Sequence, residues 1–239
     1  MKWGDRYDHN YVNNLYKSIL KFTKLKTQLI CFTDNKDNIY KDVICKPLPL
    51  INIPKVLSET PWRKLSIWQY PLEQLKGDVL FLDLDLVITN NLDKFFSYKP
   101  GSFCVIENWT QKGKGIGNTS CFRFPIQKFK YIFDQFEKNA HTIWKKYHIE
   151  QVYISKTIEK QNFWPENWCK SFKHNLLPKW PLRIWKPAKL PSDTSIVAFT
   201  GKPDPEDVLN ENWPVPQNKF YKKIYKQVKC PDWLKDNWK

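Results

Sequence analysis

The chain has 239 residues, of which 41% are hydrophobic and 16% aromatic, a composition that excludes an intrinsically disordered protein. Lys and Arg (39 residues) outnumber Asp and Glu (24), and the formal net charge of +15 favours anionic ligands. Only four of the basic residues are arginines, which disfavours a nucleic-acid partner because recognition of bases and phosphates depends strongly on the arginine fork.

Strand-like and helical patterns alternate along the chain. Apolar residues at helical spacing, and a cap at Asp8, predict a first helix that carries Val12, Leu15 and Ile19. Further helices are expected over 62–70, from Pro125 to Phe136 and near 146–159, and strands over 28–34, 42–48, 79–87, 102–108 and 195–200. This alternation predicts an α/β fold with a mostly parallel sheet flanked by helices. Prolines and tryptophans concentrate after residue 165, which predicts an irregular C-terminal part.

Two acids, Asp83 and Asp85, interrupt the apolar run VLFLDLDLV. On a strand they point to the same face. In open α/β sheets ligands bind beyond the carboxyl ends of the strands, so two aligned carboxylates there suit Mg²⁺ or Mn²⁺ bound to a phosphorylated ligand. The plainer alternative is that one acid caps the following turn and the other pairs with a lysine.

A haloacid-dehalogenase-like phosphatase is one enzyme class that uses such a pair. There Asp83 would be the nucleophile and Asp85 the general acid. That superfamily carries the motif on its first strand, whereas two strands are expected before it here. It also needs a later acidic pair, and the only late acidic cluster, PDPEDV, is interrupted by prolines. The phosphatase is therefore the minority interpretation.

Eight segments in order resemble the GT-A glycosyltransferases, in particular bacterial and viral relatives of the family 8 nucleotide-sugar transferases. The segments are KWGDRYDHNYVNNLY, ICFTD, WRKLSIW, LFLDLDLVITNNLD, GIGNTSCFRF, HIEQVYIS, SFKHNL and AFTGKPDPED. The resemblance implies a GT-A-like fold and transfer of a sugar, with retained configuration, from a nucleotide-sugar donor such as a UDP-sugar. It also implies a carbohydrate or glycolipid acceptor and a Mn²⁺ or Mg²⁺ cofactor.

The resemblance also implies roles for individual residues. Asp83 and Asp85 would hold the metal, and Glu150 and Gln151 would be the catalytic pair near the sugar and the acceptor. The remaining donor-binding residues would be Trp3, Gly4, Asp5, Lys64, Asp83, Asn118, Ser120, Lys173, Gly201 and Lys202. Taken alone, Gly201 and Lys202 would be read as an ordinary turn, and Trp3 equally well as a core residue.

Two positions depart from the family pattern. Thr200 stands where relatives have a histidine as third metal ligand, and a hydroxyl is a poorer ligand than an imidazole. Glu150 stands where relatives commonly have the shorter Asp. Both departures bear on activity more than on fold.

The C-terminal segment NKFYKKIYKQVKCPDWLKDNWK (218–239) interleaves seven lysines with aromatic residues. We expect a glycosyltransferase domain over 1–217, with 218–239 packed on the same domain. Basic and aromatic residues together also suit an anionic membrane surface or single-stranded nucleic acid, so a non-catalytic binding module stays open.

The expected location is the cytoplasm, including the inner face of a membrane. The N-terminal residues lack the apolar stretch of a signal peptide, and no run approaches the ~18 apolar residues of a membrane-spanning helix. Six cysteines without any CxxC pair predict free thiols in a reducing compartment.

Overall fold

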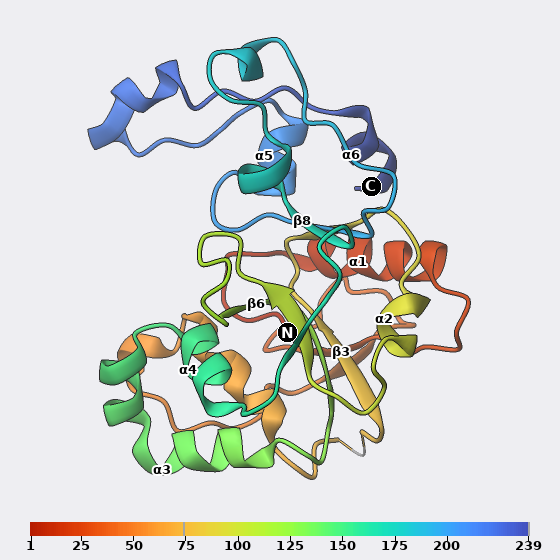
Figure 1. The fold of residues 1–239 in the computed structure, drawn as a ribbon, viewed down its shortest axis with the longest axis vertical. Coiled ribbons are helices and arrows are strands. Elements are labelled where there is room, and N and C mark those ends of the chain that lie inside the picture. The colour runs from red at the N-terminus through yellow and green to blue at the C-terminus, as the bar shows by residue number, and fades with distance from the viewer. Residues whose placement is uncertain (74, 239) are drawn as a thin grey trace. The chain divides into compact units, whose positions relative to one another are not determined.

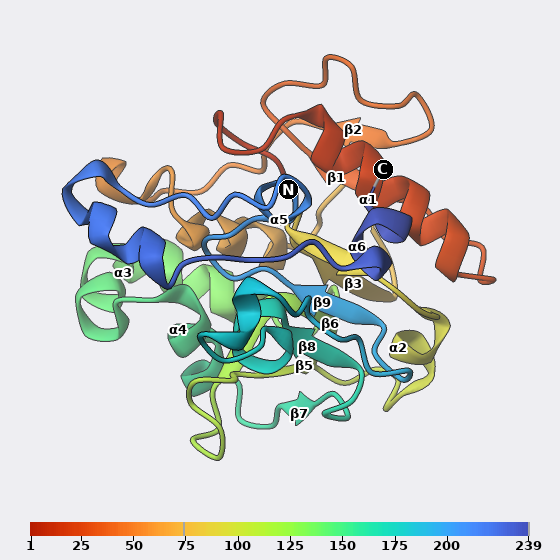
Figure 2. The ribbon, with the colours of Figure 1, turned by 90° about the horizontal axis from the view of Figure 1, so that it is seen from above.

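The expected alternation of helices and strands is present in the computed structural model, which describes residues 1–73 and 75–238 (Figures 1 and 2). Contacts between residues divide the chain into two units. Unit 1 comprises Met1–Asn13, Leu25–Leu84 and Asp93–Trp164, and unit 2 comprises Asn14–Lys24, Asp85–Leu92 and Pro165–Lys239. Each unit has a sheet and helices of its own.

Unit 1 contains the larger share of regular structure. Its strands are β1 (Ile30–Phe32), β2 (Ile44–Lys46), β3 (Asp78–Leu82), β5 (Cys104–Glu107), β6 (Gly117–Pro125) and β7 (Asn162–Phe163). Its helices are η1 (Lys55–Leu57), η2 (Pro61–Trp68), α2 (Asp93–Ser97), α3 (Lys130–Tyr147) and α4 (Glu150–Thr157). The strands form a parallel pair, β1–β2, and a four-stranded sheet in the order β3-β6-β5-β7.

Unit 2 is built on a three-stranded sheet in the order β4-β9-β8. The strands are β4 (Leu86–Ile88), β8 (Cys169–Ser171) and β9 (Ile196–Ala198). Around them lie η3 (Phe172–Leu176), η4 (Leu182–Ile184), α5 (Pro205–Leu209), η5 (Gln217–Ile224) and α6 (Asp232–Asn237). Helix α1 (His9–Phe22) begins in the part of the chain assigned to unit 1 and ends in the part assigned to unit 2.

The two larger sheets are mixed, which corrects the expectation of a mostly parallel sheet, while the α/β class is confirmed. Strand β6 runs antiparallel to both of its neighbours, β3 and β5, and β4 runs antiparallel to β9. Parallel pairing joins β1 to β2, β5 to β7 and β8 to β9. The sequence pattern could not reveal this, because strands buried on both faces have the same apolar character in either direction.

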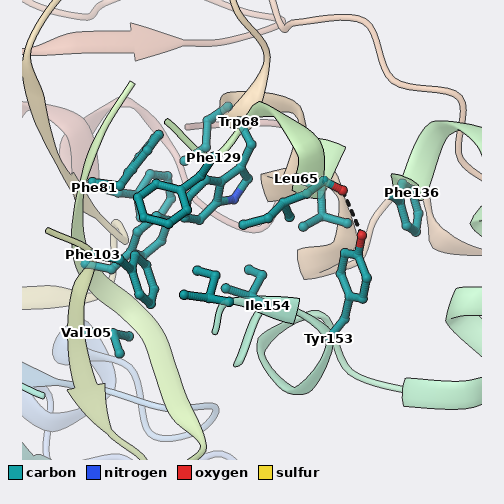
Figure 3. Packing of buried hydrophobic residues seen from close by; sticks show 14 of the residues in the cluster. Leu65, Trp68, Phe81, Phe103, Val105, Phe129, Phe136, Tyr153 and Ile154 are labelled. Atoms are coloured by element: carbon teal, nitrogen blue, oxygen red, sulfur yellow. Dashed lines mark hydrogen bonds between the residues drawn. The ribbon is translucent and has the colours of Figure 1, made fainter. Parts of the chain in front are cut away.

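The core of unit 1 forms around η2, a 3₁₀ helix that lies where a helix was expected over 62–70. Residues three apart share a face in a 3₁₀ helix, so Trp62, Leu65 and Trp68 all point into the core. The Trp68 ring centroid lies 4.2 Å from that of Phe124 and 6.0 Å from that of Phe129 (Figure 3). Lys64 is not at a multiple of three from these residues, so it lies on a different face of the helix.

Helices α3 and α4 close this core. Helix α4 lies within the range expected near 146–159, whereas α3 begins at Lys130 and not at Pro125, because Pro125 ends β6. His148, with a φ of 58°, separates the two helices. Tyr153 of α4 donates a hydrogen bond of 2.8 Å from its hydroxyl to the Ile132 carbonyl of α3 (Figure 3). Burial raises the pKa of this tyrosine well above its usual value, which keeps the hydroxyl protonated as the donor.

Candidate active site

The two acids of the VLFLDLDLV run lie in a turn between two strands rather than on one strand. Strand β3 ends at Leu82, residues 83–85 make the turn, and β4 begins at Leu86. On one side, Asp83 donates its backbone N–H to the Ser120 carbonyl at 2.9 Å; on the other, the Asp85 carbonyl accepts from Phe199 at 3.1 Å. The expectation that both carboxylates share one strand face is therefore wrong. At this turn the chain passes from the sheet of β3 to the sheet of β4, so side chains no longer alternate regularly between two faces of one strand.

The Asp83 carboxylate is held by Lys64, the lysine of the WRKLSIW segment. The Lys64 ammonium lies 2.7 Å from each carboxylate oxygen, and the two side chains are only 9% and 18% exposed. The ammonium also lies 5.5 Å from the centroid of the Phe81 ring. Each of the two charges thus has a partner of opposite sign, which offsets part of the cost of removing it from water. This contact joins two residues that sequence reasoning assigned to the same ligand.

Ser120 of β6 is bonded to Asp83 through the backbone, and Asn118 precedes it by two residues on the same strand. The register between β5 and β6 shifts between Val105 and Ile106, so that Val105 faces Phe122 and Ile106 faces Asn118. Irregularities of this kind re-aim side chains and are frequent next to active sites. Both polar residues are buried, and the Asn118 amide oxygen accepts the Ser120 N–H at 3.1 Å.

Glu150 of α4 contacts Thr119, which lies between Asn118 and Ser120 on β6 and therefore points to the other face of the sheet. Its carboxylate accepts a hydrogen bond from the Thr119 hydroxyl at 2.8 Å, and it is buried. Ser155 of the same helix, α4, accepts the Gly117 N–H at 2.8 Å, so the helix is tied to β6 at two points. Gln151 is half-buried and is thus the more accessible member of the pair.

The Trp3-Gly4-Asp5 segment follows a short parallel bridge between Lys2 and Thr33. Gly4 has a φ of +60°, and its N–H donates to the Asp34 carboxylate at 2.9 Å. Sequence reasoning missed Asp34, although it ends the ICFTD segment. It also missed Glu59, whose carboxylate oxygen lies 2.6 Å from the point where a side chain on Gly4 would begin. Trp3 is half-buried and Asp5 exposed.

The N-terminal residue lies near the Lys64–Asp83 pair. Burial lowers the pKa of the Met1 amino group, and the charges of Cys31, Asp83 and Lys64 also act on it. That Trp3, Gly4 and Asp5 share a site with this pair stays a prediction.

In unit 2 the expected donor-binding residues Lys173 and Gly201 lie together. Lys173 donates from its ammonium to the Thr200 carbonyl at 2.8 Å, and a side chain on Gly201 would begin 3.9 Å from the same ammonium. Burial, followed by the charge of Lys226, lowers the pKa of Lys173. Gly201 has a φ of +71°, which favours glycine at this position.

Lys202 is engaged by acids of its own segment. Its ammonium lies 2.8 Å from Asp204 and 3.0 Å from Asp207. Burial by itself would lower the pKa of Lys202, but the hydrogen bonds to Asp204 and Asp207 outweigh that effect and raise it. The side chain is a permanent cation whose charge is balanced locally, and a diphosphate would have to compete with two carboxylates for it.

No family model matches the chain, and no curated protein matches it in sequence. Solved structures do match. The galactosyltransferase LgtC, in complex with donor and acceptor sugar analogs, aligns with a TM-score of 0.58 at 11% identity over 92% of this chain and 98% of that one. The chain has the fold of these glycosyltransferases.

Two further structures agree with this assignment of the fold. An active-site variant of LgtC, in which a glutamine is replaced by glutamate, aligns with a TM-score of 0.57 at 11% identity over 98% of both chains. The glycosyltransferase GlyE of Streptococcus pneumoniae aligns at 0.55 and 14% identity, over 98% of this chain and 62% of that chain. The expected GT-A-like glycosyltransferase architecture is thus confirmed.

The metal expected at Asp83 and Asp85 can be tested against the side chains of this glycosyltransferase fold. Within residues 1–73 and 75–238, no three or more His, Cys, Asp and Glu side chains gather so that they could hold a metal ion. Mg²⁺ is nevertheless commonly held by one or two carboxylates together with substrate phosphates and water. Two carboxylates therefore fit a metal that a diphosphate helps to hold, provided that Lys64 releases an Asp83 oxygen.

No helix formed by the described residues has both the length and the apolar character needed to cross a bilayer.

Proposed function

We propose that this protein transfers a sugar from a nucleotide-sugar donor, a UDP-sugar, to a carbohydrate or glycolipid acceptor. The observation that carries the proposal is the Lys64–Asp83 pair at the end of β3, where the Asp83 backbone is bonded to Ser120 of β6. It occurs in a fold shared over nearly the whole chain with LgtC, whose structure contains donor and acceptor sugar analogs. A polar cluster at a strand end is where ligands bind in such α/β folds.

In this reaction the bond between the sugar's anomeric carbon and the diphosphate oxygen breaks, and the diphosphate leaves with the electron pair. An acceptor oxygen forms the new bond to the anomeric carbon and gives up its proton. Negative charge develops on the leaving diphosphate, so cations near it accelerate the reaction. We propose Lys64, which is buried in unit 1, for this purpose, and we retain Lys173 of unit 2 only as a separate candidate for contact with the donor.

Asp83 and Asp85 are the residues that would hold a divalent cation. When bound, Mn²⁺ or Mg²⁺ would neutralise part of the charge that develops on the leaving diphosphate. Lys64 already neutralises Asp83 in the absence of a ligand. We therefore propose that metal binds together with the donor, because the phosphate oxygens supply ligands in addition to the two carboxylates.

Gln151 is the residue that we propose to contact the sugar or the acceptor. Glu150 is buried against Thr119 and supports the position of the helix, whereas Gln151 is partly accessible. An active-site glutamine of LgtC was the target of substitution in one of its solved structures, which is consistent with a role for this residue type in such a fold. Retained configuration rests on the family resemblance and would be read from the anomeric proton signals of the product.

The test is a thermal-unfolding panel of nucleotides and nucleotide sugars, with and without Mn²⁺. A ligand at a hundredfold excess over its Kd should stabilise the protein by ~2.7 kcal/mol. We expect UDP or a UDP-sugar with Mn²⁺ to give the largest shift and Asp83→Asn to abolish the metal-dependent part. The exposed Lys138→Gln, on α3, serves as the control and should respond as the parent does.

Two outcomes would overturn the proposal. One is a panel in which no nucleotide stabilises the parent protein. The other is hydrolysis of simple phosphate esters that Asp83→Asn abolishes, because that result identifies a phosphatase of the dehalogenase type instead.

A further inference from the structure

Two segments of unit 2 expose a concentration of large hydrophobic side chains. The segments are 177–190, which contains η4, and 214–230, which contains η5, and together they are called the aromatic–basic surface here. Trp185 is 68% and Phe220 74% exposed, values expected of flexible polar side chains rather than of large aromatic ones. The other exposed members are Trp180, Leu182, Tyr221, Ile224 and Tyr225.

The same two segments are basic and contain no acid. Segment 177–190 has four basic residues and segment 214–230 has five, and neither includes an Asp or a Glu. Lys186 and Lys223, among others, are exposed next to the aromatic residues. Lys229 pairs at 2.6 Å with Glu211, which lies just outside the second segment. No acid within the two segments balances the charge of the other basic residues.

The two segments are joined to each other. The Trp180 indole N–H donates to the Ile224 carbonyl at 3.3 Å, which connects the start of η4 to the end of η5. The chain after η5 behaves differently, because Leu234 and Trp238 are buried and the Trp233 indole donates to the Ala188 carbonyl at 2.9 Å. In Figures 1 and 2 the blue η5 segment projects away from the part of unit 2 that holds α5 and α6.

We propose that the aromatic–basic surface binds an anionic lipid bilayer. Aromatic side chains with a polar edge favour the headgroup region, and each lysine near an anionic bilayer adds an attractive contribution. Leu182 and Ile224 offer no ring for stacking on a nucleic-acid base, yet they add apolar surface that a bilayer can cover. Arg183 is the only arginine in the two segments, which also favours lipid over nucleic acid.

The sequence alone assigned the membrane contact to the whole of 218–239, whereas the exposed side chains come from the first part of that segment together with segment 177–190. Residues 231–238 pack within unit 2, whereas residues 217–225 and the distant segment around Trp185 supply the exposed side chains. The inference does not rest on the proposed transfer reaction, since lipid binding is measured without a donor.

The test is co-sedimentation of the full chain with vesicles of phosphatidylcholine alone or with one third phosphatidylglycerol. We expect binding to the anionic vesicles only, weakened by salt. Neutralising two lysines, in Lys186→Gln with Lys223→Gln, should lower the partition coefficient roughly thirtyfold, at about fivefold for each charge. Removing two aromatic anchors, in Trp185→Ser with Phe220→Ser, should lower it by about tenfold or more.

Matched controls come from exposed positions of unit 1. Lys138→Gln with Lys145→Gln changes the net charge equally, and Leu50→Ser with Val56→Ser removes exposed apolar surface. We expect both controls to bind as the parent does. Brominated phosphatidylcholine in the same anionic vesicles should quench tryptophan fluorescence in the parent and less in Trp185→Phe.

Three results would overturn the proposal. They are equal binding to neutral and anionic vesicles, surface variants that bind as tightly as their controls, and tighter binding to a single-stranded oligonucleotide than to anionic vesicles. Nucleotide stabilisation is scored separately, so a failure of lipid binding leaves the proposed transfer reaction untouched.

Discussion

At the scale of single residues, the most informative contact is the ion pair in which the Lys64 ammonium touches both carboxylate oxygens of Asp83. Burying a carboxylate or an ammonium alone is costly, and a close pair offsets much of that cost. Both Asp83 oxygens lie 2.7 Å from one ammonium, so the charge of the carboxylate is already balanced without a metal. A divalent cation must therefore displace Lys64 from at least one oxygen. A diphosphate can make that exchange favourable, because it offers the displaced ammonium a new anionic partner.

Replacing Lys64 by methionine should change metal and nucleotide binding in opposite directions. In Lys64→Met, Asp83 loses its chelating cation, so Mn²⁺ alone should bind about tenfold more tightly, a change of the size that altered partners of metal ligands produce. UDP without metal should bind more weakly, because one cation near its phosphates is gone. Titration calorimetry with Mn²⁺ and with UDP, each alone and then combined, measures both effects.

Lys64→Arg is the matched control, since it keeps the charge and should leave Mn²⁺ binding weak in the absence of nucleotide. If Lys64→Met and the parent bind Mn²⁺ alone with the same affinity, Lys64 does not compete with the metal. Folding of the variant is checked by its unfolding transition, because the uncompensated Asp83 should reduce stability.

The site residues differ in how far the sequence could predict them. The motif at Asp83 and Asp85 stands out because acids are rare in an apolar run, but its neighbours depend on distant parts of the chain. Lys64 was one lysine among many, and only the fold reveals that it meets Asp83. Nothing in the local pattern indicated that Lys202 would be balanced by Asp204 and Asp207. Burial of Glu150 against Thr119 likewise arises from the packing of α4 on β6.

At the scale of elements, the sequence predicted the places of strands better than their ends and directions. The expected strands over 28–34, 42–48, 102–108 and 195–200 each contain an observed strand. The run over 79–87 was expected as one strand, and its division at 83–85 has no local signal because Leu84 and Leu86 continue the apolar pattern. The division follows from pairing with two different partners, β6 and β9, which are remote in the chain.

The segment between α2 and β5 depends on one buried arginine. Arg123 of β6 is fully buried; it donates to the carbonyls of Phe95 and Phe96 at 2.5 Å and 3.0 Å and also to those of Lys99 and Ser102. Its guanidinium lies 3.4 Å from the Asp78 carboxylate. A single side chain thus satisfies several backbone acceptors that have left water.

We expect Arg123→Met to lower the free energy of unfolding by ~3–5 kcal/mol, the usual cost of removing one partner from a buried charged network. Several carbonyls would lose their donor and the Asp78 carboxylate its nearby cation, whereas methionine restores only the apolar contacts. Asp78→Asn is the matched comparison and should cost less, because the carbonyls would still hold the guanidinium. Urea unfolding at neutral pH measures both. A loss for Arg123→Met within ~0.5 kcal/mol, typical of surface changes, would contradict this role.

At the scale of the whole molecule, the net charge of +15 is the dominant electrostatic feature. Self-repulsion in the folded state works against compactness, and it is strongest at low ionic strength, where the Debye length is ~30 Å. The ion pairs have the opposite dependence on salt, because screening weakens attraction as well as repulsion. Those at Lys64–Asp83 and Lys202–Asp204 involve partly buried acids and are screened less than surface pairs. The balance thus depends on exposed lysines, which lose repulsion as salt is added.

We therefore expect thermal stability to rise between ~10 mM and ~150 mM NaCl, as the Debye length falls from ~30 Å to ~8 Å. Chloride is the appropriate anion, because phosphate or sulfate could bind at the candidate active site and stabilise the fold by mass action instead. Lys186→Gln with Lys223→Gln removes two of the exposed charges and should reduce this salt dependence. Asp204→Asn, which releases Lys202 from one acid, should increase it. A melting temperature that falls with NaCl would mean that attractive pairs, and not the excess of lysine, set the electrostatic contribution to folding.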